Sequence, residues 1–301
     1  MFQTILVPLD GSALAERAIA YAEILARSAS GRIVFVRAVP YGPGFRPEGA
    51  TSEDHAQGHV GEAESYLADV IALATAADVK TEHIVQQGDP AKVIFQAIDD
   101  VDADMVVMST HGRGAIGRAL CGSVADAVLR GAPVPVLLVP QVADATWWDR
   151  APIRLLVPLD GSEFAEQALP FATELTRTLN GSMVLVRAAG YEVDLALAGA
   201  FGDKREAANT YLKAVAARLK AVDVEATVEV QEALPIRAIL QVADKYQAQG
   251  VVMATHGRVG AARLLLGSTT DATVHASRLA VLVIPPGAAG RRTTSPESLA
   301  S

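Results

Sequence analysis

Two segments of this sequence, 145 positions apart, carry glycine, serine and arginine at the same spacing. In each, a glycine is followed after nine residues by a glycine–serine pair: Gly112 with Gly122 and Ser123, and Gly257 with Gly267 and Ser268. Backbone N–H groups beside glycine can approach a phosphate closely, and a helix start adds further donors. Positive charge in the same segments comes from Arg113, Arg118, Arg258 and Arg263. The spacing therefore predicts two similar phosphate-binding loops.

The run Pro-Leu-Asp-Gly-Ser occurs twice, each time well upstream of one of these glycine segments, and each copy contains an aspartate. The carboxylates of Asp10 and Asp160 can hydrogen-bond a ribose or an amide, or hold a magnesium ion through oxygen. They can equally cap the following helix or fix the turn. Taken alone, this pattern favours the structural role.

Other residues near the glycines have both structural and functional interpretations. Ser123 and Ser268 each begin a Ser-x-x-Asp pattern that ends at Asp126 or Asp271, which predicts a capping box at a helix start. One serine can serve both as a cap and as a phosphate ligand. His111 and His256 also recur, either as general bases or as residues that orient the phosphate loop.

Several further patterns are discounted. The segment Gly112–Gly117 matches GxGxxG but follows the fourth expected strand, and its copy breaks the pattern, so it is no dinucleotide fingerprint. The sequence has no GxxxxGK[ST] motif of a P-loop NTPase. His55 and His59 lack a third metal ligand nearby, and Cys121 aligns with Leu266, which suits an apolar packing site.

Most of the chain consists of two copies of one sequence pattern. Residues 5–12 return as residues 155–162, an offset of 150, whereas residues 110–113 return as residues 255–258, an offset of 145. The second copy has therefore lost five residues between its second strand and the following turn. We expect a first domain over 1–140, a linker over 141–151, a second domain over 152–286 and a disordered tail over 287–301.

Short apolar runs alternate with helical patterns in each copy. The first copy is expected to have strands at 4–9, 32–39, 80–87, 104–109 and 134–139, and helices at 13–29, 56–76, 91–100 and 123–131. This order predicts an α/β fold, with a Rossmann-like, doubly wound, five-stranded parallel sheet in each of two tandem domains. The third strand alternates in polarity and is expected at a sheet edge. Ligands of such sheets bind beyond the carboxyl ends of the strands.

The amino-acid composition and charge argue against several classes of protein. The chain has 301 residues, is 50% hydrophobic and carries a formal net charge of −8. Its apolar runs are strand-sized, below the roughly 18 residues that a membrane helix needs, and its acidic balance argues against nucleic-acid binding. A lone cysteine excludes a disulfide framework. The N-terminal sequence lacks a secretory signal, so we expect a cytoplasmic protein.

Together, the duplicated motif and the two aspartates resemble the universal stress protein family in its tandem-domain form. ATP-binding members carry G-x2-G-x9-G-[ST], and here Ser109 and Ala254 replace the first glycine. The resemblance implies that Ala38 and Ala188 hold adenine through their backbone. It implies pocket walls at Pro8, Met108, Pro158 and Met253. It implies phosphate contacts at Gly112, Gly122, Ser123, Val124, Gly257, Gly267, Ser268 and Thr269.

The resemblance further implies an ATP-binding stress regulator with one Mg²⁺–ATP in each domain. No residue is clearly placed to activate water, so we expect at most slow ATP hydrolysis or autophosphorylation. The apolar last strands, residues 135–139 and 280–284, are expected to pair within the chain, and whole chains to form a homodimer that meets an unknown protein partner. The alternative is an interaction scaffold of the same fold without a nucleotide. The choice among ATP, AMP and a cyclic nucleotide stays open.

Overall fold

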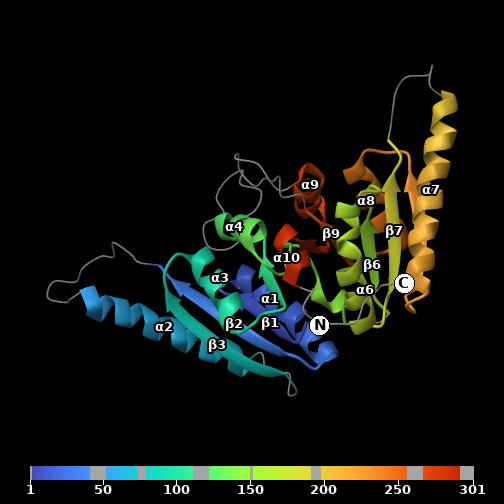
Figure 1. Cartoon of the computed structure of the whole chain (residues 1–301). Helices are drawn as coiled ribbons and strands as arrows, with labels where there is room; N and C mark the ends of the chain where they lie inside the picture. The colour runs from blue at the N-terminus through green and yellow to red at the C-terminus, as the bar shows by residue number, and fades with distance from the viewer. Residues whose placement is uncertain are drawn as a thin grey trace. The chain divides into compact units, whose positions relative to one another are not determined.

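The chain folds into two compact units, Met1–Gln141 (unit 1) and Val142–Ser301 (unit 2). The structure, a computed structural model, describes residues 2–40, 52–73, 79–110, 122–149, 152–190, 198–255 and 267–291. Figure 1 shows the helices and strands of both units.

Unit 1 consists of parallel strands with helices between them. Its elements are β1 (Thr4–Pro8), α1 (Ala13–Ala29), β2 (Arg32–Val39), α2 (Ser52–Leu73), β3 (Lys80–Gln87), α3 (Pro90–Asp100), β4 (Met105–Ser109), α4 (Ser123–Gly131) and β5 (Val136–Val139). The strand order is β3-β2-β1-β4-β5, and the pairings of these strands are parallel. The expected edge position of the third strand is therefore confirmed.

Unit 2 repeats this order. After a short 3-10 helix, η1 (Ala145–Trp147), come β6 (Arg154–Pro158), α5 (Glu163–Glu166), α6 (Ala168–Thr178), β7 (Ser182–Ala188), α7 (Ala198–Lys220), β8 (Ala226–Gln231), α8 (Pro235–Tyr246), β9 (Gly250–Ala254), α9 (Ser268–Ala276), β10 (Ala280–Ile284) and α10 (Pro286–Arg291). Its strands run in the order β8-β7-β6-β9-β10. The predicted α/β fold with doubly wound parallel sheets is confirmed.

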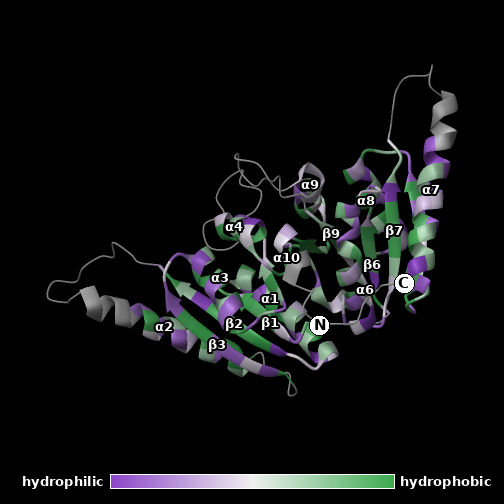
Figure 2. Cartoon of the chain, in the orientation of Figure 1, coloured by the Kyte–Doolittle hydropathy of each residue, from purple (hydrophilic) through white to green (hydrophobic). Residues whose placement is uncertain are grey.

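Burial explains why the strands are apolar along their whole length. The central strands β1, β4, β6 and β9 are almost entirely buried, because helices cover both faces of each sheet. Figure 2 shows these strands as hydrophobic, and the long helix α7, which packs on β7 and β8, mixes hydrophilic and hydrophobic residues. This arrangement is that of an amphipathic helix with one face on the sheet.

One helix differs between the repeats. The single helix α1 of unit 1 corresponds in unit 2 to α5 and α6, which are separated at Gln167. Pro170 lies in the first turn of α6 and cannot donate the hydrogen bond that would join the two segments. Unit 1 has Ala20 at the equivalent position, so its helix continues.

Two predicted boundaries differ from the structure. The linker residue Trp148 is buried in unit 2, and its indole Nε1–H donates to the carbonyl oxygen of Gln249 at 2.7 Å. The tail expected from residue 287 instead begins with helix α10, whose Ala288 is only 1% exposed. Pro286 starts that helix because its fixed φ suits a first helical position. Residues 292–301 of the expected tail lie outside the described part of the chain.

Candidate functional site

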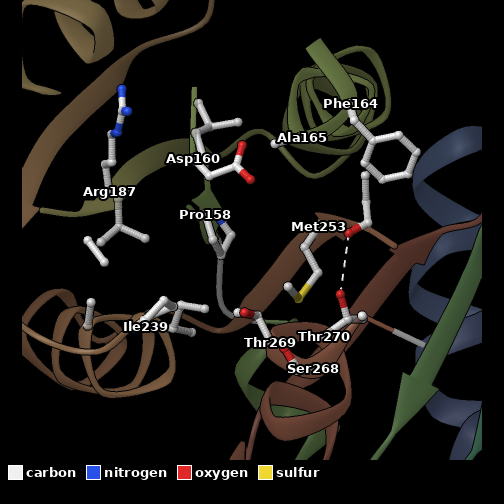
Figure 3. A pocket seen from close by; sticks show the side chains of 17 residues that line it. Pro158, Asp160, Phe164, Ala165, Arg187, Ile239, Met253, Ser268, Thr269 and Thr270 are labelled. Atoms are coloured by element: carbon white, nitrogen blue, oxygen red, sulfur yellow. Dashed lines mark hydrogen bonds between the residues drawn. The ribbon is translucent and has the colours of Figure 1, made fainter. Parts of the chain in front are cut away.

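A pocket of about 350 Å³ opens at the carboxyl ends of the strands of unit 2 (Figure 3). Its volume lies within the roughly 300–1,000 Å³ of typical small-molecule sites. The lining residues are Pro158, Leu159, Asp160, Phe164, Ala165, Val186, Arg187, Ala188, Pro235, Ala238, Ile239, Met253, Ala254, Gly267, Ser268, Thr269 and Thr270. They come from the ends of β6, β7 and β9, from the turn after β6, and from helices α5, α8 and α9 with the N-cap glycine of α9.

The pocket gathers residues that the sequence singled out separately. Eight of the ten residues expected to bind a ligand in unit 2 line it: Pro158, Asp160, Ala188, Met253, Ala254, Gly267, Ser268 and Thr269. The other two, Gly257 and Arg258, lie outside the described residues. Phe164, Arg187 and Ile239 also line the pocket and were not predicted; the two apolar residues, taken alone, give no functional signal in a sequence.

Strand register explains why these residues meet. Leu155 and Leu156 of β6 pair with Gly250 and Val251 of β9, and continuing this register places Pro158 beside Met253. The crossover after β6 runs to β7 on one side, whereas β9 lies on the other side. The pocket therefore sits at the topological switch point of the sheet, where ligands of doubly wound folds bind.

A helix start forms the polar end of the pocket. Helix α9 has Gly267 at its N-cap position, and no side chain hydrogen-bonds to its first turn. The N–H groups of Ser268 and Thr269, in the first turn, have no acceptor among the described residues. With the positive end of the helix dipole behind them, these amides suit an anion.

The predicted capping boxes are wrong in both units. Ser123 and Ser268 are the first residues inside α4 and α9, so neither hydroxyl stands at the position from which it could cap the helix. Asp126 instead accepts from Arg130 Nε at 3.0 Å. The glycine before each serine takes the cap position, and a glycine has no side chain to satisfy the amides.

The amide donors of the cap glycines themselves are already used. Gly122 N–H donates to the carbonyl oxygen of Thr110 at 2.8 Å, and Gly267 N–H makes a longer contact of 3.4 Å to Thr255 Oγ1. The donors available for a ligand are therefore those of the following residues. In unit 1 these are Ser123 and Val124, whose N–H groups also meet no acceptor in the part of the chain described.

The two aspartates fix the turns that follow β1 and β6. Asp160 Oδ1 accepts from Ser162 N–H at 2.9 Å and from its hydroxyl at 2.6 Å, and Ser162 Oγ then caps α5 by accepting from Ala165 N–H at 3.1 Å. Asp10 makes the same bonds in unit 1. The structural alternative is thus realised, while Asp160 also lines the pocket.

Arginine, tyrosine and glutamate form a cluster beside each aspartate turn, here named the RYE cluster. In unit 2 the Arg187 guanidinium lies 5.1 Å from the centre of the Tyr211 ring, and the Tyr211 hydroxyl donates to Glu166 Oε1 at 2.9 Å. In unit 1 Arg37, Tyr66 and Glu16 repeat the arrangement at 4.6 and 2.8 Å. Burial, and then the hydrogen bond to glutamate, raises the pKa of each tyrosine.

The RYE cluster was not predicted from the sequence, although the sequence contains a signal for it. Arginine and glutamate recur at the offset of 150 and tyrosine at the offset of 145, in step with the rest of the repeat. A systematic comparison of polar residues between the copies finds them. Their side chains come from β2 or β7, from the second long helix of the unit and from the helix after the aspartate turn.

The expected site residues of unit 1 occupy equivalent places. Pro8 ends β1, Ala38 lies near the end of β2, and Met108 and Ser109 end β4. Gly122, Ser123 and Val124 start α4, and the β1–β4 register continues to place Pro8 beside Met108. The expected residues His111, Gly112, Arg113, Arg118, His256 and Arg263 lie outside the described residues, as do the discounted Cys121 and the side chain of the discounted His55.

Two further observations concern metal binding and membrane insertion. Among the residues that the structure describes, no three histidine, cysteine, aspartate or glutamate side chains form a group that could hold a metal ion. Within the same part of the chain, no helix combines the length and the apolar character needed to cross a membrane.

Comparison with known proteins agrees with the repeat and the fold. The sequence pattern of the universal stress protein family matches residues 1–140 and again residues 153–285. A universal stress protein of Mycolicibacterium smegmatis is 28% identical over 94% of this chain and 97% of its own length. One of Thermus aquaticus is 37% identical over 46% of this chain and 99% of its own length.

The fold comparison covers both units. A crystal structure of a universal stress protein from Archaeoglobus fulgidus has a TM-score of 0.73 and 22% identity, covering 95% of this chain and 99% of that one. At this identity the likeness concerns the fold. With the family pattern matched twice, the chain belongs to the universal stress protein family and carries two tandem copies of its domain.

Proposed function

We propose that this chain is an ATP-binding regulator of the universal stress protein family, with one Mg²⁺–ATP site in each unit. The observation that carries the proposal is the pocket of unit 2. It joins an apolar slot to a helix start whose amides meet no acceptor among the described residues. An adenine base suits the first part and phosphates suit the second.

The apolar part of the pocket is lined by side chains that suit a flat ring. Pro158 and Met253 lie side by side at its floor, and Ile239 of α8 forms a wall (Figure 3). Ala188 at the end of β7 presents only a methyl group, which leaves its backbone accessible to an adenine edge. The walls therefore favour a planar, largely apolar group with hydrogen-bonding edges.

The polar part fits a chain of phosphates. Gly267 brings the backbone of α9 close to the pocket, and Ser268, an exposed residue, offers both an amide and a hydroxyl. Asp160 also lines the pocket, and its carboxylate suits the hydroxyl groups of a ribose between base and phosphates.

One carboxylate in each site is enough to help hold a magnesium ion. Mg²⁺ is commonly held by one or two carboxylates together with substrate phosphates and water. Asp160 or Asp10 would supply the carboxylate and the nucleotide its oxygens. The ion would neutralise phosphate charge, and this arrangement needs no further metal ligand from the described residues.

Isothermal titration with Mg²⁺–ATP tests the proposal. The full chain should bind about two nucleotides, and Ala188→Phe or Ala38→Phe, which fills the expected adenine slot of one unit, should each remove one. Leu73→Phe is the control, because Leu73 is 88% exposed and belongs to neither site. A wild-type protein that gives no heat with millimolar Mg²⁺–ATP would refute the proposal.

The scaffold alternative makes the opposite prediction. If the motif residues serve packing alone, both phenylalanine variants would keep any partner that the wild type captures and neither would change a nucleotide signal. The same titrations with AMP and a cyclic nucleotide decide which nucleotide is preferred.

The proposal also covers the cellular location, the protein partner and the oligomeric state of the chain. We infer that nucleotide occupancy changes partner binding in the cytoplasm, and that whole chains form homodimers. Light scattering across a concentration series tests the dimer, and a constant monomer mass would contradict it.

A further inference from the structure

The RYE cluster of unit 2 touches the aspartate turn directly. A Cβ built on Gly161 would lie 2.8 Å from Arg187 Nη1, 3.0 Å from Nη2 and 3.1 Å from Cζ. The end of the Arg187 guanidinium therefore lies against the position that a side chain at residue 161 would occupy. Gly161 also has φ +89°, a backbone conformation that favours glycine at this place.

The tyrosine ring approaches the same guanidinium from α7. Tyr211 lies 5.1 Å from Arg187 and is held by its bond to Glu166, whose other carboxylate oxygen accepts from Arg218 at 2.5 Å. The ring, the guanidinium and the glycine thus connect α7 to the loop that carries Asp160. In Figure 3 the Arg187 guanidinium points away from Ser268 and Thr269, while its stem lines the pocket.

Unit 1 repeats the arginine–tyrosine contact and the positive φ of the glycine in the aspartate turn. Arg37 lies on the Tyr66 ring, and Gly11 has φ +79° in the equivalent turn. The Asp10 carboxylate is among the charges that raise the pKa of Tyr66, after burial and the Glu16 hydrogen bond, so the cluster and the aspartate lie near each other. The arrangement therefore occurs twice in one chain.

We propose that Arg187 and Arg37 are positioning residues for the ribose end of the nucleotide sites. Each holds the aspartate turn from behind, so that the Asp160 or Asp10 carboxylate faces the ligand. This proposal rests on the proposed function and names the residues that set the shape of that site. It predicts that the arginines affect the nucleoside part of a ligand and not the phosphate part, which binds at α9 or α4.

Two ligands distinguish binding of the nucleoside part from binding of the phosphate part. Mg²⁺–ATP uses both ends of the site, whereas inorganic tripolyphosphate with Mg²⁺ uses the helix start alone. In the full-length Arg37→Met/Arg187→Met variant, ATP affinity should fall about tenfold because the turn loses its support, while tripolyphosphate affinity stays within about twofold. Arg205→Met, which removes an exposed arginine paired with Glu232, is the control and should change neither affinity.

A double-mutant cycle tests the contact itself. Gly161→Ala should weaken ATP binding more in the wild type than in Arg187→Met, because the added methyl group meets the guanidinium only when arginine is present. Equal effects in both backgrounds would contradict the contact. Thermal unfolding of each variant identifies any loss of fold.

The outcomes distinguish the two proposals. Equal loss of ATP and tripolyphosphate, or loss of neither, overturns the positioning role and leaves the nucleotide sites in place. If the wild-type chain binds neither probe, the proposed function fails and the positioning role fails with it. A tenfold loss confined to ATP supports both.

Discussion

A negative charge placed at the start of α9 should stabilise the fold and weaken the ligand. Ser268→Asp puts a carboxylate on an exposed residue in the first turn, where no side chain caps the helix. The interaction with the helix dipole is worth roughly 0.3–1 kcal/mol. For a unit of this size we expect the melting temperature to rise by about 1–3 °C.

The same charge would repel the phosphates of a bound nucleotide. At about 5 Å in water, two unit charges repel by roughly 0.8 kcal/mol, so a doubly charged phosphate loses roughly 1.7 kcal/mol, or about 20-fold in affinity. The repulsion between exposed charges should shrink at high salt because counterions screen it. The variant therefore has effects of opposite sign on stability and on binding.

Calorimetric titration and thermal unfolding of the full chain measure both effects. Ala276→Asp is the matched control, because it adds the same charge to the exposed last residue of the same helix, where the dipole is unfavourable. This control should lower the melting temperature and leave ATP affinity nearly unchanged. A Ser268→Asp protein that melts earlier and binds ATP as the wild type does would refute the reasoning.

Three further predictions concern the fold. Gly181→Ala should destabilise unit 2 by about 1–3 kcal/mol, because its Cβ would overlap the Ile153 carbonyl oxygen; unchanged thermal unfolding would contradict this. Trp148→Ala removes an indole that is 3% exposed and should cost about 3–5 kcal/mol by denaturant unfolding; a loss below about 1 kcal/mol would show that the linker does not contribute. The raised pKa values of Tyr66 and Tyr211 mean that the unfolded chain ionises first, near pH 10, so stability should be retained below pH 10 and fall above it. Replacing both tyrosines with phenylalanine should flatten that fall in a pH series of melting temperatures, and an equally steep fall would exclude the two hydroxyls.

Patterns along the chain were enough to predict the sheet. The strands at 32–39 and 80–87 were predicted with their observed bounds, because continuous apolar or alternating runs report burial directly. Eight of the residues that line the pocket of unit 2 were expected from the repeated motif and the family resemblance, although their meeting at one switch point depends on the strand order. The nucleotide assignment itself stays a prediction.

Two features could not be derived in the same way. The Ser-x-x-Asp pattern predicts a capping box, but the helices start one residue earlier than the box requires, and only the backbone angles of Gly122 and Gly267 reveal this. The RYE cluster depends on side chains from three elements that meet only in the fold. Its signal is visible between the repeats and not within either one.

The glycine starts of α4 and α9 have a consequence for local motion. Each helix has only nine residues, and helices this short are marginal without outside support. Their first turns should therefore fray more readily than the strands beside them, with fast hydrogen exchange at the leading amides. An anion that accepts those amides would slow the exchange there first, before any change reaches the core.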